Sequence, residues 1–127
     1  MDQLIHAAPR PVILCLSQAG MELARKLADA LDGDIHGHVV RCPDAPHHFG
    51  RARQHIADLF CSGRPVIGIC AAGILIRAVA PHLNHKSVDA PVISVAESGR
   101  VVVPLIGGHH GAIIMAQKVS EAIDADL

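Results

Sequence analysis

Two short loops contain the residue types best suited to binding or catalysis. The first, residues 68–73, joins a strand-like run to a helix-like run and is followed by Arg77. Backbone N–H groups at a helix start, together with a nearby guanidinium group, suit a carboxylate or a phosphate, so Gly73 and Arg77 are predicted ligand contacts. The loop has neither a Walker pattern nor G-x-G-x-x-G, so nucleotide binding is not supported. A structural alternative stays open, in which small residues allow tight strand–helix packing and Arg77 pairs with an acidic neighbour.

The second loop, residues 107–111, has three glycines and two histidines in five positions. Glycines let the backbone approach a ligand closely, and imidazole rings supply hydrogen-bond donors or a general base. We therefore predict that Gly107, Gly108 and Gly111 bind substrate and that His109 and His110 are catalytic. The alternative is a glycine-rich connection whose histidines are solvated.

Other histidines raise the question of a metal site. His36 and His38 alternate along a strand-like run and therefore share one face, and His47 and His48 follow in the next loop. Three imidazoles can bind zinc, but histidines on a half-exposed strand are more often surface residues. We therefore predict no zinc at these four positions and no cofactor of the protein's own.

The four cysteines form no C-x-x-C pair, and two of them, Cys15 and Cys70, lie inside apolar runs. We expect reduced thiols that behave as small hydrophobic residues. Cys70 lies at a strand-to-helix turn, where a nucleophile elbow would place its nucleophile, but no G-x-S-x-G pattern accompanies it. Two carboxylates beside the expected hairpin, Asp89 and Glu97, are further candidates, although most such groups are simply solvated.

The composition excludes several classes of protein. Half of the 127 residues are hydrophobic, which supports a packed core and excludes general disorder. Eleven basic residues face 12 acidic ones, so no charge surplus is available to neutralise nucleic acid. The longest nearly unbroken apolar run, residues 73–80, is too short to cross a membrane. Because the first residues have no basic region before an apolar block, we expect a cytoplasmic protein without a secretory signal.

The elements that must position the two loops follow from hydrophobic patterning. Short apolar runs predict strands, and apolar residues at helical spacing predict helices between them. The expected strands cover residues 11–17, 34–40, 65–70, 92–96 and 100–106, and the expected helices include residues 23–31, 52–60, 73–80 and 112–123. The order β-α-β-α-β-α-β-β-α favours a three-layer α/β domain with a mostly parallel sheet of about five strands and a hairpin at Ser98-Gly99.

The direction of the last two strands decides whether the two loops can share a site. If every helix brings the chain back to the edge of the sheet where the strands begin, the first four strands are parallel. The hairpin then directs the fifth strand to the edge opposite the first loop. If Pro81 instead stops its helix early, residues 81–90 can run back along the sheet, and the fifth strand then reaches the first loop. We expect the second arrangement, because it alone gathers Arg77, Asp89 and His109 into one anion-binding cleft.

The span between the loops resembles a known family. Residues 73–83 (Gly-Ile-Leu-Ile-Arg-Ala-Val-Ala-Pro-His-Leu), then Lys86 and residues 89–91 (Asp-Ala-Pro), and then residues 108–112 (Gly-His-His-Gly-Ala) are similar to the amino-terminal domain of the cobalamin-biosynthesis protein CbiG. The Gly-Gly-His-His-Gly sequence resembles the variant fused to precorrin-3B C17-methyltransferase. The resemblance is dense over residues 64–118.

The resemblance implies a function in building the corrin ring. The family is a cobalt-precorrin-5A hydrolase, which opens a lactone and releases a two-carbon aldehyde, and its substrate has a rim of carboxylates. The resemblance implies that Lys86 and Asp89 also bind the substrate. It further implies that His109 activates water and that backbone amides of the loop stabilise the oxyanion. The hydrolase pattern has a serine where this chain has Gly107, and an asparagine where this chain has Ile113. Two functions therefore stay open: a hydrolase-like domain, or a non-catalytic docking module for a precorrin methyltransferase.

Overall fold

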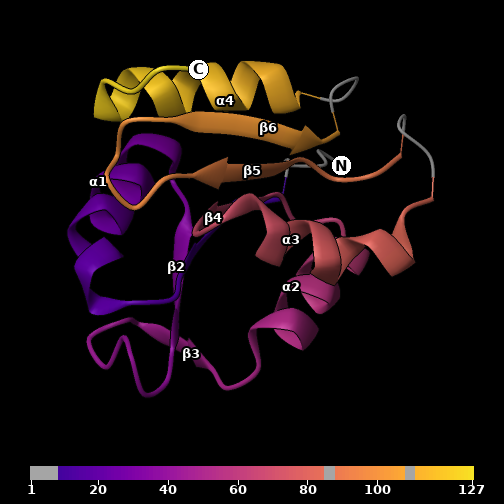
Figure 1. The fold of residues 1–127 in the computed structure, drawn as a ribbon, viewed down its shortest axis with the longest axis horizontal. Coiled ribbons are helices and arrows are strands. Elements are labelled where there is room, and N and C mark those ends of the chain that lie inside the picture. Colours follow the sequence, from indigo (N-terminus) through magenta and orange to yellow (C-terminus); the bar gives the residue numbers. More distant parts are fainter. Residues whose placement is uncertain (1–8, 85–87, 108–110) are drawn as a thin grey trace, which may run out of the picture.

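The computed structural model describes residues 9–84, 88–107 and 111–127. These residues form one sheet with helices on both faces, which confirms the predicted α/β class (Figure 1). The strands are β1 (Val12–Cys15), β2 (Asp34–His38), β3 (His47–Phe49), β4 (Val66–Ile69), β5 (Val92–Val95) and β6 (Val102–Ile106). The helices are α1 (Met21–Leu31), α2 (Ala52–Cys61), α3 (Ala72–Val79) and α4 (Ala112–Ile123), with 3-10 turns η1 (Gln18–Gly20) and η2 (Ala80–His82). Within these ranges no helix is long and apolar enough to span a membrane.

The sheet is mostly parallel, with the strand order β3-β2-β1-β4-β5-β6. The neighbours from β3 to β5 pair in parallel, and β6 pairs antiparallel with β5, as the opposed arrows in Figure 1 show. The hairpin between β5 and β6 turns where expected, with Gly99 at φ 75° and the Ala96 N–H donating to the Val101 carbonyl at 2.9 Å. The carboxyl ends of five strands therefore lie at one edge of the sheet, called here the carboxyl edge, and β6 ends at the other, the amino edge.

Strand β3 lies in a segment that the sequence predicts to be a loop. It has three residues and pairs with the end of β2, so that His36 is opposite His47 and Gly37 is opposite His48. The segment before β3 folds tightly against Gly37, where an added Cβ would lie 2.6 Å from the Cβ of Ala45. Two prolines hide this strand from pattern analysis, because proline normally marks turns or the edge of a sheet.

The expected direction of the last two strands is wrong. Pro81 does not stop the return of the chain, because it occupies a first-turn position of η2, where its ring and its missing N–H are tolerated. The chain thus reaches the amino edge before β5 begins, and β5 runs parallel to β4. The hairpin then makes β6 antiparallel and places its end at the amino edge.

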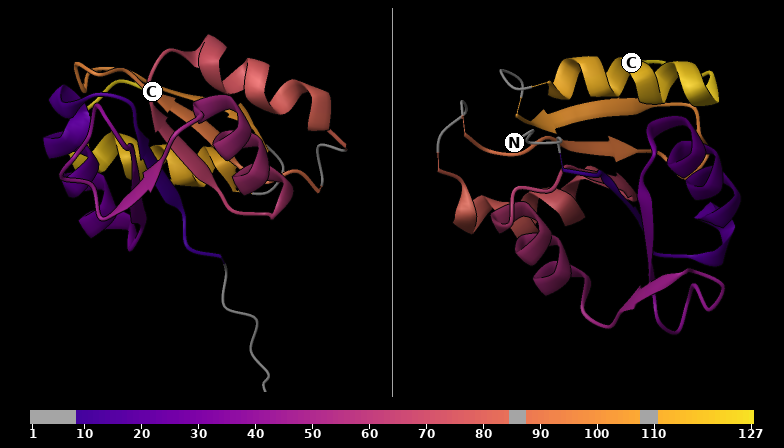
Figure 2. Two further views of the ribbon diagram at one scale, coloured as in Figure 1. Left: turned by 90° about the horizontal axis from the view of Figure 1, so that it is seen from below. Right: turned by 180° about the vertical axis from the view of Figure 1, so that it is seen from behind.

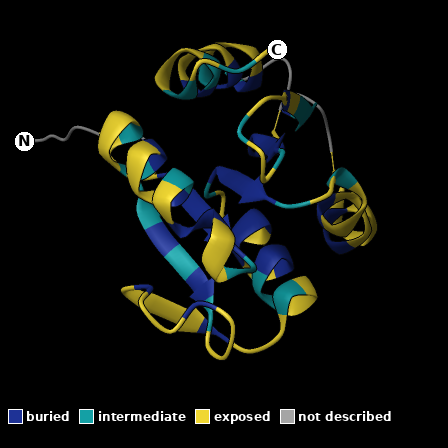
Figure 3. Cartoon of the chain, turned by 60° about the vertical axis from the view of Figure 1, so that its left-hand side comes forward, coloured by how far each residue is buried: buried dark blue, intermediate teal, exposed yellow. Residues whose placement is uncertain are grey.

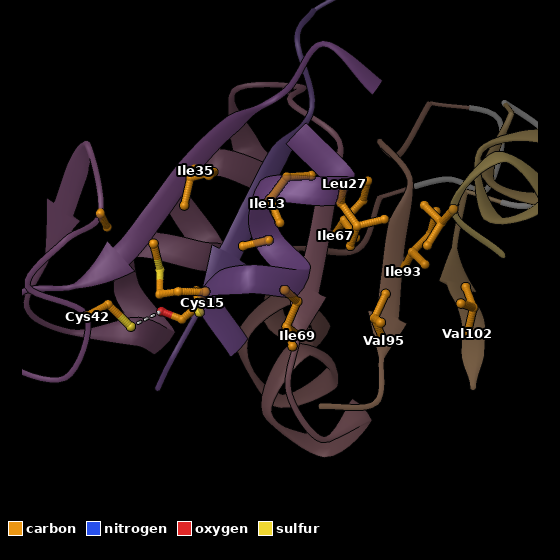
Figure 4. Packing of buried hydrophobic residues seen from close by; sticks show 14 of the residues in the cluster. Ile13, Cys15, Leu27, Ile35, Cys42, Ile67, Ile69, Ile93, Val95 and Val102 are labelled. Carbon is orange, nitrogen blue, oxygen red and sulfur yellow. Dashed lines mark hydrogen bonds between the residues drawn. The ribbon is translucent and has the colours of Figure 1, made fainter. Parts of the chain in front are cut away.

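Two apolar clusters hold the layers together, one on each face of the sheet. On one face α1 and α4 pack on side chains that include Ile13, Ile67 and Ile93 (Figure 4). On the other face α2 and α3 pack on Val12 and Leu14, and Figure 2 shows the helices on the two sides of the sheet. Full burial of one such side chain is worth about 1.5–3 kcal/mol. The outward faces of the helices are exposed (Figure 3). The strands are thus covered by packed helices on both faces.

Candidate functional site

The two candidate loops lie at opposite edges of the sheet. The loop before α3 follows β4 at the carboxyl edge, whereas Gly107 follows β6 at the amino edge. The helices that follow them, α3 and α4, also pack on opposite faces. The expected single cleft formed by Arg77, Asp89 and His109 is therefore wrong, because the topology separates the helix of Arg77 from the loop that contains His109.

The carboxyl edge has a shallow groove of about 460 Å³ beside the start of α3. Its lining includes Cys70, Ser94 and Glu97 together with small and β-branched residues. The Ser94 hydroxyl donates to the carbonyl of Cys70 at 2.9 Å, and burial raises the pKa of the Cys70 thiol to about 11. The Glu97 carboxylate accepts a hydrogen bond from the Ser17 hydroxyl at 2.6 Å. The charged group of this groove is thus an acid, which does not favour an anionic ligand.

The crevice between β1 and β4, where the strand order reverses, is the usual ligand position in open α/β sheets. Here Gly20, which follows β1, packs against the ends of β1 and β4. Gly20 packs so closely that an added Cβ would lie 3.1 Å from the Cys15 sulfur and 3.3 Å from the Ile69 side chain. This close packing agrees with the missing nucleotide motifs.

On α3, Gly73 and Arg77 are exposed and point away from the apolar cluster formed by Leu75, Ala78 and Val79. An added Cβ at Gly73 would meet nothing within 4 Å, and its φ lies outside the left-handed region. Packing within the described residues therefore does not require a glycine at this position.

The amino edge contains the remaining predicted residues that the structure describes. Gly107 has φ 85°, and an added Cβ would lie 2.8 Å from the Cα of Pro91, so only glycine fits there. Gly111 has φ 91° and is the N-cap of α4. Lys86, Gly108, His109 and His110 are outside the described residues.

Asp89 lies at the same edge, just before β5, and is 9% exposed. Its two carboxylate oxygens accept the backbone N–H of Asn84, each at 3.2 Å. The carboxylate therefore ties Asn84, just after η2, to the residues just before β5, and it also lines a small hollow of about 360 Å³ with His82 and Asn84.

A cavity of about 450 Å³, comparable in volume to the groove at the carboxyl edge, lies beside Gly111. Residues from the entry to β1, from the end of α1 and from α4 line it: Pro9, Arg10, Pro11, Ala30, Leu31, Asp32, Gly111, Ile114, Met115 and Lys118. Two cations, Arg10 and Lys118, and one carboxylate, Asp32, supply its charges. The N-terminus of α4 begins at its rim. The N-cap Gly111 has no side chain to cap the first turn, in which the Ala112 N–H donates to the Gly107 carbonyl at 3.2 Å. A positive helix end and two cations suit a carboxylate ligand with apolar surface.

Sequence reasoning missed Arg10 and Lys118. Lys118 lies two helical turns after Gly111 and could have been found as the next residue on the same face of the helix. Arg10, between two prolines just before the first strand, reaches the cavity only through the arrangement of β1 against α1 and α4.

The histidines of the β2–β3 corner form hydrogen bonds with protein groups. His36 Nδ1 and His55 Nε2 are 2.8 Å apart, and His48 Nε2 lies 3.0 Å from the Cys42 carbonyl oxygen. Burial, with the nearby His55 charge as the next cause, lowers the pKa of His36 to about 4, and burial also lowers the pKa of His55. Among the residues that the structure describes, no group of three or more His, Cys, Asp or Glu could hold a metal ion. All four cysteines are free thiols.

Comparison with known proteins relates this chain to cobalamin synthesis. The family model described as Cobalamin synthesis G N-terminal matches residues 54–127. The cobalt-precorrin-5A hydrolase of Priestia megaterium is 31% identical over 77 residues, which are 60% of this chain and 21% of that protein. The hydrolase of the same name from Salmonella typhimurium is 30% identical over 100 residues, which are 78% of this chain and 28% of that protein.

A solved structure shares the fold. It is a cobalamin biosynthesis protein G homolog from Sulfolobus solfataricus, which superposes with a TM-score of 0.67 at 18% identity. The match covers 93% of this chain and 36% of that one. The chain thus spans between a fifth and a third of the length of its two hydrolase relatives.

Proposed function

The chain belongs to the Cobalamin synthesis G N-terminal family, and from that premise we propose that it binds a carboxylate-rich precorrin intermediate at the amino edge of its sheet. The observation that carries the proposal is the 450 Å³ cavity beside Gly111, with Arg10, Lys118 and the N-terminus of α4 around it. The corrin periphery offers acetate and propionate carboxylates for these groups, and its apolar ring contacts Ile114 and Met115.

The loop that joins β6 to α4 contributes the chemistry in this proposal. Gly107 is held against Pro91, and Gly111 begins α4, so both ends of the loop have defined positions. We assign His109 the activation of water and His110 a supporting acid–base function, while backbone amides of Gly108 and its neighbours stabilise the oxyanion of an opening lactone.

Binding is tested by calorimetric titration with cobyrinic acid, a corrin that retains its peripheral carboxylates. The same corrin with amides in place of the carboxylates is the control ligand. We expect the acid to bind and the amide to bind at least about tenfold more weakly, because the amide has no charge for Arg10 and Lys118. Lys118→Gln is expected to weaken binding of the acid by about fivefold, and Lys26→Gln, an exposed lysine of α1 outside the cavity, leaves it unchanged. Equal binding of acid and amide would refute the proposal.

Catalysis is tested separately with cobalt-precorrin-5A, by measuring release of the two-carbon aldehyde. The hydrolase-like function predicts release by the wild-type chain and its loss in His109→Ala. If the wild-type chain binds the corrin acid and releases no aldehyde, the domain binds substrate without turning it over.

A second candidate function is docking to a precorrin methyltransferase, and α3 is the observation that favours it. Gly73, Ile76 and Arg77 are exposed on α3, which packs on the face of the sheet opposite α4. Within the described residues, packing does not require a glycine at position 73. Docking predicts that Arg77→Glu weakens a complex with the purified methyltransferase in size-exclusion chromatography but leaves binding of the corrin acid unchanged. A complex that is equally stable with Arg77→Glu would exclude this surface.

A further inference from the structure

The cavity beside α4 contains an arginine that the fold already holds in position. Arg10 donates from Nε and Nη2 to one oxygen of Asp34, at 3.2 and 3.0 Å. The other Asp34 oxygen accepts from Arg64 Nη2 at 2.6 Å, and Arg64 Nε donates to the backbone carbonyl of Arg10 at 3.1 Å. Both the side chain and the main chain of Arg10 are therefore tied to β2 and to the start of β4. A guanidinium fixed in this way loses little conformational freedom when it binds a ligand.

The third hydrogen bond of Arg10 has a different character. Its Nη1 donates to Asp32 Oδ1 at 3.1 Å, and the Asp32 side chain is 87% exposed, whereas that of Asp34 is 26% exposed. Asp32 is the C-cap of α1, with a left-handed backbone at φ 53°. An exposed pair of this kind is weakly held, because water competes for both partners. The guanidinium group of Arg10 is thus held in position by Asp34, and its Nη1 forms a weak, exposed hydrogen bond with Asp32.

Arg10 and Asp32 both line the cavity and are joined there through Nη1, and Lys118 supplies the second cation of the lining. A ligand carboxylate that approaches Nη1 meets the Asp32 carboxylate in the same place, and two carboxylates side by side repel each other. The ligand must therefore replace Asp32 at Nη1.

We propose that Arg10 is the carboxylate receptor of this cavity and that Asp32 is a built-in competitor which a carboxylate of the ligand displaces. The inference rests on the proposed function and adds to it a specificity device. A ligand with a single weak anionic group gains little by displacing Asp32. A polycarboxylate that also reaches Lys118 and the N-terminus of α4 gains several interactions at once. The competitor thus selects for ligands with several carboxylates, such as a corrin acid.

The test compares Asp32→Asn with Asp29→Asn in titrations with cobyrinic acid. Asparagine tolerates the left-handed backbone at position 32, so the variant is expected to fold. Asp29 is exposed on α1 outside the cavity lining, and its substitution makes the same change in net charge. We expect Asp32→Asn to tighten binding by about two- to fivefold and Asp29→Asn to change it by less than about 1.5-fold.

Arg10→Gln removes the receptor and is expected to weaken binding by about tenfold or more, with folding checked by the thermal melt. If Asp32→Asn binds the acid no better than wild type, while Lys118→Gln still weakens binding, the role of Asp32 as a competitor is refuted and the proposed function stands. If the wild-type chain does not bind cobyrinic acid, the proposed function fails.

In that second case tricarballylate, a small tricarboxylate, tests the receptor alone. Its binding must shift the NMR signal of Arg10 Nε and must do so at lower concentration in Asp32→Asn. An unshifted Arg10 signal in both proteins would overturn the inference.

Discussion

At the scale of single residues, two glycines of the candidate loops have opposite structural roles. Gly107 is buried, has φ 85° and lies against the backbone of Pro91, whereas Gly73 is exposed on α3 with open space around it. Replacement of each by alanine separates a glycine that the fold needs from one that it does not.

We expect Gly107→Ala to lower the free energy of unfolding by about 2–3 kcal/mol, because the new methyl group meets immobile backbone in a strained conformation. Gly73→Ala, the matched control, is expected to raise it by up to about 1 kcal/mol through better helix propensity. Urea denaturation measures both. A Gly107→Ala protein as stable as wild type would show that the β6–α4 connection is not held against Pro91.

The pair His36–His55 predicts how stability depends on pH. Burial lowers the pKa of His36 to about 4, so the folded protein binds fewer protons than the unfolded chain between about pH 4 and 6.5. The contribution of the pair to the free energy of unfolding is therefore fully present above about pH 6.5 and is lost as the pH drops toward 4. The groups that face the pair are His47, Arg64, Asp34 and Asp58.

The expected loss from the pair is of the order of 1 kcal/mol, since both rings are partly exposed. His36→Gln should flatten the dependence of the unfolding free energy on pH in this window. His82→Gln, at an exposed position of η2, should keep it. An unchanged slope in His36→Gln would show that other groups cause the acid sensitivity.

At the scale of elements, hydrophobic patterning is sufficient to predict most of this fold. All four α-helices and five of the strands lie where apolar spacing and glycine or proline boundaries indicate them. Strand β3 could not be predicted in this way, because its three residues form a strand only through pairing with the end of β2. The direction of β5 depends on whether residues after Pro81 continue a helical turn or run back along the sheet, and local sequence permits both.

The contact between β4 and α3 gives an element-scale prediction. An alanine at Gly68 would bring its Cβ within 2.8 Å of the Leu75 side chain, the buried residue by which α3 packs on the sheet. Gly68→Ala should destabilise the protein by about 1–3 kcal/mol through this overlap, and Leu75→Ala by about 2–5 kcal/mol through a cavity.

The double variant should be more stable than the sum of the two losses implies, by about 1 kcal/mol, because the smaller side chain makes room for the new methyl group. Thermal and urea denaturation of the four proteins give this coupling. Strictly additive losses would mean that the close approach of α3 to β4 is not what requires Gly68.

At the scale of the whole molecule, the path of the chain decides which residues can act together. Helix α3 returns the chain to the amino edge, the hairpin of β5 and β6 ends there, and α4 then covers the face opposite α3. This topology brings Gly111 together with Arg10 and Lys118, which no local pattern connects, and separates them from the loop before α3.

NMR mapping of bound cobyrinic acid tests most directly whether the ligand binds at the amino edge. With the 15N-labelled chain, we predict that the largest amide shifts cluster at Arg10, Asp32, Gly111 and Lys118, which line the 450 Å³ cavity, and that they vanish when the carboxylates of the corrin are replaced by amides. Shifts that cluster instead around residues 71–73 and Glu97, at the carboxyl edge, would contradict the assignment of the site.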